Sequence, residues 1–415
     1  MPSPELVKAL DIYSKYFQKH LETAPIMWDT TTRRFYYVSS LDKLFDWIWN
    51  MSVITTFIGL GSIVFVLGRD IIVDRKTLPL FNIIGLALMG IMGVAVVGIA
   101  IALVFYGKDF AYGWNELHQM EDQLSDMRAQ QSHRNIPQEQ DYFGKGLTIM
   151  MKILPFYMFV FPVVGLITKL DPFYIIFSLA GSYIKDPFAL QFFTFGTTII
   201  RALLIFTSVV EALRHTSLVL VMFAAALYTG GKNCTHLLAI SVSRNAVEMS
   251  KLISIVYQLD LHIRLMSKFQ ESCTTALFGF GLFAGVLINV GSIQLMDVLP
   301  FWFYVYFPSA SVMVVLTISV LLPQAQIVND RSKGVIEKWK IAVMGEWDTR
   351  KKAYLRKKLK TLKPAGLQVG IHEVRFFTIE RSTKAAFYVK ILDNTINLSL
   401  AIPPGALNTR FGGLA

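Results

Sequence analysis

The sequence is short of charge and of cysteine, and each shortage excludes a class of protein. Charged residues make up only 17% of the 415 residues and apolar residues 53%, a balance that excludes a chain of two or three ordinary soluble domains. With just two cysteines, Cys234 and Cys273, a disulfide-rich secreted scaffold is excluded as well. We expect both to be reduced thiols near the cytoplasmic ends of membrane-spanning helices.

Motifs that carry catalysis or hold a metal are also missing. The seven histidines are scattered, without an HExxH motif, and the sequence has no GxSxG motif, phosphate-binding loop or dinucleotide-binding glycine pattern. We therefore expect no enzymatic activity and no metal or other cofactor. The first forty residues lack the apolar stretch and cleavage site of a signal peptide, so we expect the chain to start in the cytosol.

What is present is a series of long apolar stretches. A membrane-spanning helix needs about 20 predominantly apolar residues, and seven stretches are long enough. They cover roughly residues 44–67, 80–106, 147–170, 191–228, 273–295, 301–322 and 384–402. The sequence therefore predicts an all-α membrane protein with seven transmembrane helices.

The distribution of basic residues predicts the orientation of these helices. Of the 40 lysines and arginines, 29 fall in segments that are cytoplasmic if the N-terminus is, and 6 fall in the external segments. Cytoplasmic loops carry the excess of basic residues in membrane proteins, so the N-terminus is predicted to be cytoplasmic and the C-terminus extracellular. This orientation explains the net charge of +11 without a nucleic acid partner.

The last predicted span is too polar to face lipid on all sides. Its polar residues share one arc of a helix at about 100° per residue: Lys390, Asp393, Asn394 and Asn397. The adjoining arc holds Phe387, Ile391, Thr395, Leu398 and Ile402. Polar groups at membrane depth must face protein or water, so this span is a candidate pore helix inside an assembly. Lys390 is predicted to point away from the ions and to pair with Asp393 or an acidic neighbour.

A second candidate site is aromatic. Aromatic residues gather at the predicted outer ends of spans 3, 4 and 6, where they form either an interfacial belt or the wall of a cavity for a small organic ligand. We favour the cavity, because phenylalanine is not a belt residue. The predicted ligand-binding residues are Tyr157, Phe161, Phe195, Thr198, Asn289, Trp302 and Tyr306.

Span 4 carries Glu211, Arg214 and His215 near its middle. Ionisable groups at that depth are candidates for a functional role. The alternative is an internal ion pair between Glu211 and Arg214, three residues apart, that holds the helix against its neighbours. Both interpretations are open at this point.

The last third of the chain contains LRKKLKTLKPAGLQVG (Leu355–Gly370), FFTIERST (Phe376–Thr383) and a span ending ILDNTINLSLAI. These stretches resemble the arthropod gustatory and odorant receptor superfamily. The order of spans and loops extends the resemblance over nearly the whole chain. The segments WDTTTRR (Trp28–Arg34) and GWNELHQMEDQL (Gly113–Leu124) are more typical of gustatory than of odorant receptors.

The last span departs from the pattern of that superfamily, which often has a Thr-Tyr pair, five apolar residues and then a Gln-Phe pair. Here Phe387-Tyr388 stands at the start, and Asn394-Thr395 stands where the second pair would fall. Carried over by position, the resemblance implies that the pore-lining residues are Ile391, Asn394, Thr395 and Leu398.

The resemblance implies a ligand-gated, non-selective cation channel of the plasma membrane, opened by a small organic tastant or odorant. It implies a homotetramer or a heterotetramer with related receptor subunits, in contact with membrane lipid and permeating cations. The basic segment Arg350–Pro364 lies in the predicted cytoplasmic loop before the last span. It would bind either anionic lipid or acidic residues of a neighbouring subunit.

On this basis we expect five parts in the chain. They are a cytosolic segment (1–44), spans 1–6 with the ligand-binding bundle (45–328), a cytoplasmic anchor loop (329–382), the pore-lining span (383–403) and an extracellular tail (404–415). Two alternative functions are a seven-helix receptor that signals through a G protein and a small-molecule transporter. The predicted orientation disfavours the first, and the lack of a repeated half disfavours the second.

Overall fold

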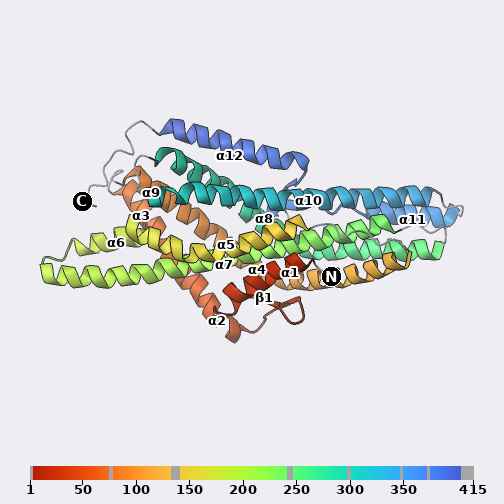
Figure 1. Cartoon of the computed structure of the whole chain (residues 1–415), viewed down its shortest axis with the longest axis horizontal. Helices are drawn as coiled ribbons and strands as arrows, with labels where there is room; N and C mark the ends of the chain where they lie inside the picture. The colour runs from red at the N-terminus through yellow and green to blue at the C-terminus, as the bar shows by residue number, and fades with distance from the viewer. Residues whose placement is uncertain are drawn as a thin grey trace.

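Long helices that run side by side make up most of the molecule (Figure 1). The computed structural model describes residues 3–73, 78–131, 141–240, 246–296, 301–345, 349–371 and 374–402. The N-terminal part comprises α1 (Pro4–Tyr13), the π-helix η1 (Ser14–Gln18) and the antiparallel strands β1 (Ile26–Asp29) and β2 (Arg34–Tyr37). A continuous helix follows, made of α2 (Leu41–Trp49), the π-helix η2 (Asn50–Leu60) and α3 (Gly61–Ile72).

The rest of the chain is built mainly from long helices. They are α4 (Leu80–Gln131), α5 (Tyr142–Thr168), α6 (Pro172–Gly181), α7 (Pro187–Ala239), α8 (Ala246–Gln294), α9 (Phe301–Tyr304), α10 (Tyr306–Met344), α11 (Thr349–Thr361) and α12 (Arg381–Ala401). The antiparallel strands β3 (Gln368–Ile371) and β4 (Val374–Thr378) connect α11 to α12.

Six helical segments in the described part of the chain are long and apolar enough to cross a membrane, and they correspond to the first six predicted spans. They cover Leu41–Ile72, Asn82–Ala129, Tyr142–Gly181, Pro187–Ala239, Ser250–Gln294 and Tyr306–Met344. α12 has 21 residues, enough for a bilayer, but Lys390, Asp393 and two asparagines make it less apolar. The predominantly helical membrane fold is confirmed, whereas the seventh crossing and the orientation stay predictions.

Four helices are much longer than one crossing requires. α4, α7, α8 and α10 have 52, 53, 49 and 39 residues, against about 20 for a bilayer. Their extensions run together into the half of the molecule that also holds α11 (Figure 1). Span 4, predicted over residues 191–228, is part of one continuous helix, α7, that extends beyond the predicted span at both ends.

Aspartate–proline pairs start two helices at the opposite end of the bundle. Asp171 accepts a hydrogen bond from the Tyr174 amide at 2.8 Å, and Asp186 accepts one from the Phe188 amide at 3.2 Å. A proline follows each aspartate at the first helical position, where its missing N–H costs nothing. α6 packs against α3 and α7.

The N-terminal helix lies inside the bundle rather than on a membrane surface. Leu6, Leu10, Tyr13 and Phe17, whose spacing predicts a helix, are all fully buried. α1 packs against α5 and α7. The apolar stripe of this helix therefore packs within the protein.

The segments WDTTTRR (Trp28–Arg34) and GWNELHQMEDQL (Gly113–Leu124) contact each other. The Trp114 ring of α4 lies 5.7 Å from the Trp28 ring of β1 and 4.9 Å from the Phe35 ring of β2. The Asn115 side chain accepts a hydrogen bond from the Phe35 amide at 3.1 Å and donates one to the Phe35 carbonyl at 2.8 Å. Asn115 thus pairs with the edge of β2 as a neighbouring strand would.

The predicted anchor loop is mostly regular structure. α10 continues to Met344, and α11 packs against α8 and α10 with an apolar face. Its buried residues are Leu355 and Leu359, with Leu362 just beyond its end. The opposite face is exposed and basic, with Arg356, Lys357 and Lys360.

Candidate functional site

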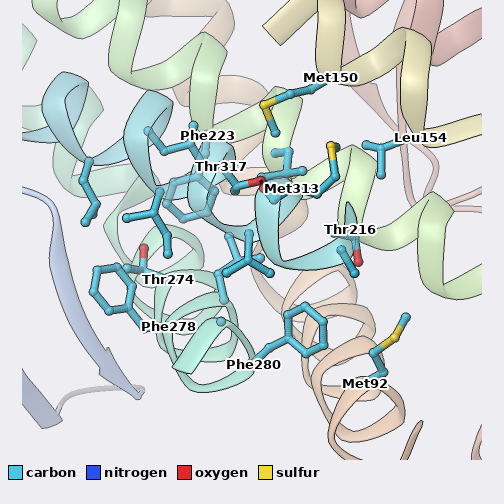
Figure 2. A pocket seen from close by; sticks show the side chains of 18 of the residues that line it. Met92, Met150, Leu154, Thr216, Phe223, Thr274, Phe278, Phe280, Met313 and Thr317 are labelled. Atoms are coloured by element: carbon cyan, nitrogen blue, oxygen red, sulfur yellow. Dashed lines mark hydrogen bonds between the residues drawn. The ribbon is translucent and has the colours of Figure 1, made fainter. Parts of the chain in front are cut away.

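A cavity of about 200 Å³ lies between α4, α5, α7, α8 and α10. We call it the core cavity. Figure 2 shows apolar side chains from these helices around a common space, among them Met92, Met150, Leu154, Phe223, Phe280 and Met313. An engineered apolar cavity of about 150 Å³ admits benzene, so the core cavity has room for a small organic molecule.

Among the described residues, the wall of the core cavity has few polar groups and no charged side chain. Its hydroxyls belong to Tyr157, Thr216, Thr274, Tyr306 and Thr317. Thr317 donates a hydrogen bond to the Met313 carbonyl at 2.9 Å, whereas the Thr274 hydroxyl is buried without a partner. The cavity therefore suits an uncharged, largely apolar molecule with a group that can bond Thr274.

α12 closes one side of the core cavity through Phe387. The Phe387 ring packs edge-on against the Phe278 ring of α8, with centroids 5.0 Å apart. Gly285 of α8 helps this close approach, because a Cβ there would lie 3.3 Å from Ile391, tighter than most contacts, whereas a Cβ on Gly281 would lie 3.5 Å from Phe387, an ordinary contact. This small-xxx-small pair packs α12 onto α8.

α12 has one face packed on its own chain and one exposed face. The packed face contacts α8 and α10, and it carries Phe387, Tyr388, Ile391, Thr395 and Leu398. Tyr388 Oη lies 2.9 Å from Ser319 Oγ of α10. The exposed face carries Lys390, Asp393, Asn394 and Asn397.

The four predicted pore residues divide between these faces. Ile391 and Thr395 are only 7% and 3% exposed, and Ile391 packs with Val286 and Val290 of α8. Leu398 is half-buried beside them, and Asn394 is exposed. The sequence shows two arcs on this helix, but the residues that decide which arc meets α8 lie a hundred positions away.

Lys390 and Asp393 do not pair in the structure. Both side chains are exposed, and no salt bridge joins them within the described residues of α12. The predicted neutralisation of Lys390 by Asp393 is therefore absent from the single chain. Both charges remain free to meet water or another subunit.

Three of the predicted ligand-binding residues line the core cavity: Tyr157, Phe161 and Tyr306. The Phe161 ring lies 5.3 Å from the Tyr157 ring and 5.0 Å from the Tyr306 ring. Sequence reasoning missed Thr274, Phe278, Phe280 and Met313 in the same wall. These positions carry no local signal, because they are ordinary apolar or small positions of long helices.

The other predicted ligand-binding residues lie elsewhere. Phe195 is 69% exposed on α7, and Thr198 is exposed one turn away. The Asn289 side chain accepts a hydrogen bond from Ser311 Oγ at 2.7 Å. The backbone of Trp302 belongs to α9, but its side chain lies outside the described residues.

The charged residues of α7 form a buried cluster. Arg214 Nη1 lies 3.3 Å from Glu211 Oε1 and 3.4 Å from Glu22 Oε2. His215 Nε2 accepts a hydrogen bond from the Trp47 indole at 3.3 Å. The internal pair of Glu211 and Arg214 is confirmed. Its partners Glu22 and Trp47 were not predictable, because they come from the N-terminal segment and α2.

No protein-family model matches the sequence, and no curated protein matches it. Solved structures do match the fold. The insect olfactory receptor OR5 from Machilis hrabei superposes with a TM-score of 0.57 and 10% identity, over 95% of this chain and 97% of that chain. The same receptor in complex with eugenol gives a TM-score of 0.53 and 9% identity, over 96% and 98% of the two chains. The resemblance to insect chemoreceptors is thus confirmed at the level of the fold.

Proposed function

We propose that this chain, which has the fold of an insect olfactory receptor, is a chemosensory receptor that acts as a ligand-gated, non-selective cation channel. Its ligand is a small uncharged organic molecule in the core cavity. The observation that carries the proposal is the wall shared between that cavity and α12. A ligand that binds better to one position of Phe387 than to another shifts α12 between two states.

The exposed face of α12 supports a pore at the centre of a tetramer. Polar side chains at membrane depth are costly unless they meet protein or water. Four copies of α12 around a common axis would give Asp393, Asn394 and Asn397 a water-filled path. Ile391, Thr395 and Leu398, the other residues suggested by the resemblance, would then hold α12 against α8.

The exposed basic face of α11 supports an anchor role for residues 329–382. We place this half in the cytoplasm of a plasma membrane protein, with the N-terminus inside. Arg356, Lys357 and Lys360 would pair with acidic groups of a neighbouring subunit or with anionic lipid. If the chain without residues 349–371 still forms a tetramer on a native gel, the pairing with acidic groups of a neighbouring subunit is contradicted.

Expression of this chain alone in oocytes tests the channel. We expect inward cation current on application of eugenol or another uncharged aromatic from a panel, recorded in excised patches without GTP. Phe387→Ala should shift the dose response, whereas Phe156→Ala, an exposed phenylalanine on α5, should not. A response that requires GTP, or an N-terminal tag accessible on intact cells, would instead favour a G-protein-coupled receptor.

A further inference from the structure

A second cavity, of about 180 Å³, lies between the continuous helix that contains η2 and helices α4, α5 and α7. We call it the η2 cavity. Its wall is mainly apolar, and it reaches the start of α6 at Pro172 and Phe173. It is distinct from the core cavity but shares Leu88, Met92, Phe161 and Tyr306 with it.

Two hydroxyls in the wall of the η2 cavity lack partners. Thr55 of η2 is 6% exposed, and its Oγ1 is buried without a hydrogen bond. Ser208 of α7 also has a buried Oγ without a partner. A Cβ on Gly59, one turn along η2 from Thr55, would lie 3.9 Å from Ser208 Oγ. The two hydroxyls therefore belong to facing walls of one space.

The turn that carries Thr55 has π-helical geometry. A threonine in an α-helix commonly donates its hydroxyl to the carbonyl four residues earlier, as Thr207 does to Leu203 at 2.9 Å. In η2 the neighbouring Thr56 donates to the Met51 carbonyl at 2.8 Å, which is the oxygen that Thr55 would otherwise use. π-helical turns are rare in proteins, and those that do occur often lie at functional sites.

The charge of the wall limits the class of ligand. Asp171 is the charged residue in the described wall, and Arg201 neutralises it through two hydrogen bonds, at 3.2 Å and 2.5 Å. The Arg201 guanidinium also lies 4.8 Å from the centre of the Tyr174 ring. No free charge of the wall is left for an ionic ligand. Unpartnered buried hydroxyls, by contrast, favour a molecule that can bond them.

We propose that the η2 cavity is a second binding site, for a small uncharged molecule with an apolar body and one hydroxyl or carbonyl group that bonds Thr55 and Ser208. This site goes beyond the core cavity and does not depend on the channel being ligand-gated. Because the two cavities share four wall residues, an occupant of the η2 cavity alters the space available in the core cavity. The second site is therefore modulatory.

Binding to the purified full-length protein in nanodiscs tests the site without recording current. The probes are p-cresol and toluene, which differ in a single hydroxyl, and the readout is the dose-dependent rise of the thermal unfolding midpoint. Thr55→Val and Ser208→Ala should each weaken p-cresol binding about tenfold, the loss of one buried hydrogen bond, and leave toluene binding unchanged. Thr55→Ser should restore p-cresol binding.

Thr56→Val is the matched control, because the Thr56 hydroxyl is already bonded to Met51. It should bind p-cresol as the unaltered chain does. Equal binding of p-cresol and toluene to the unaltered chain would overturn the proposal. So would loss of p-cresol binding in Thr274→Val but not in Ser208→Ala, because that result places the probe in the core cavity.

Discussion

α7 and α12 both carry charged residues within stretches expected to cross a membrane, and they treat them in opposite ways. On α7, Arg214 is 1% exposed and contacts two carboxylates, Glu211 and Glu22. On α12, Lys390 and Asp393 are exposed and make no ion pair with each other. Arg214 and Glu211 of α7 find ion-pair partners inside one chain, whereas Lys390 and Asp393 of α12 do not pair with each other.

The difference separates structural polar groups from functional ones. A buried charge with partners holds helices together, and its removal leaves the partner uncompensated. An exposed charge on a helix at membrane depth is unfavourable in free energy unless it contacts a neighbouring subunit or water. The same residue types in the two helices therefore indicate a bundle contact in α7 and an assembly surface in α12.

The largest expected effect comes from breaking the α7 cluster. Arg214→Met leaves the buried carboxylate of Glu211 and the half-buried carboxylate of Glu22 without their cation, and we expect a loss of about 3–5 kcal/mol in stability. Thermal unfolding of the detergent-purified protein measures it. Arg264→Met is the control, since Arg264 pairs with Asp260 at 2.7 Å but is 54% exposed. An unchanged unfolding midpoint in Arg214→Met would contradict the inference that the buried charges of α7 hold the bundle together.

The exposed charges of α12 should affect permeation rather than stability. Asp393→Asn should change stability by less than about 0.5 kcal/mol, as for most surface substitutions. In a tetramer it removes four negative charges beside the ion path, so the permeability ratio of Na⁺ to Cl⁻ should fall severalfold. Lys390→Gln removes four positive charges from the same exposed face and should raise cation conductance, contrary to the sequence-based expectation that Lys390 points away from the ions.

Leu392→Ala provides the control for these two variants, because Leu392 is exposed on the other flank of α12. It should leave the reversal potential unchanged. If Leu392→Ala alters selectivity while Asp393→Asn and Lys390→Gln do not, the apolar flank of α12 faces the ions.

The sequence predicts elements of this fold far better than it predicts their partners. Apolar length predicts seven spans, of which six are helices long and apolar enough to cross a membrane in the described part of the chain, and the resemblance in the last third leads to the correct fold. The face of α12 that meets α8 is not predictable locally, because it depends on Gly281 and Gly285, a hundred residues earlier. In the core cavity, the sequence predicts Tyr157 and Phe161 because they belong to a cluster of aromatic residues. It does not predict Thr274. A small residue on a long helix gives no sign of the space in front of it.

A substitution in the core cavity should have an intermediate effect, on the half-effective ligand concentration. Phe280→Ala removes an aromatic wall residue that a ligand would contact, and it should raise the half-effective ligand concentration about tenfold, or about 1.4 kcal/mol. Phe195→Ala makes the same substitution at an exposed position of α7 and should have no effect. Dose–response curves at matched surface expression decide between them. Equal shifts in the two variants would indicate a change in the membrane contact instead of the cavity.

The smallest effect concerns two threonines of the core cavity, one with a hydrogen-bond partner and one without. The Thr317 hydroxyl is bonded to the Met313 carbonyl at 2.9 Å, and the Thr274 hydroxyl is buried without a bond. Without ligand, Thr274→Val should therefore stabilise the protein, by up to about 1 kcal/mol, because an unsatisfied polar group becomes apolar. Thr317→Val should be neutral or destabilising.

With a hydroxylated ligand present, the order of stability of the two variants should change, since Thr274→Val also removes a group that the ligand would bond. Thermal unfolding midpoints of both variants, with and without eugenol, measure this reversal. If Thr274→Val destabilises the ligand-free protein, the Thr274 hydroxyl is already satisfied and is not available to a ligand.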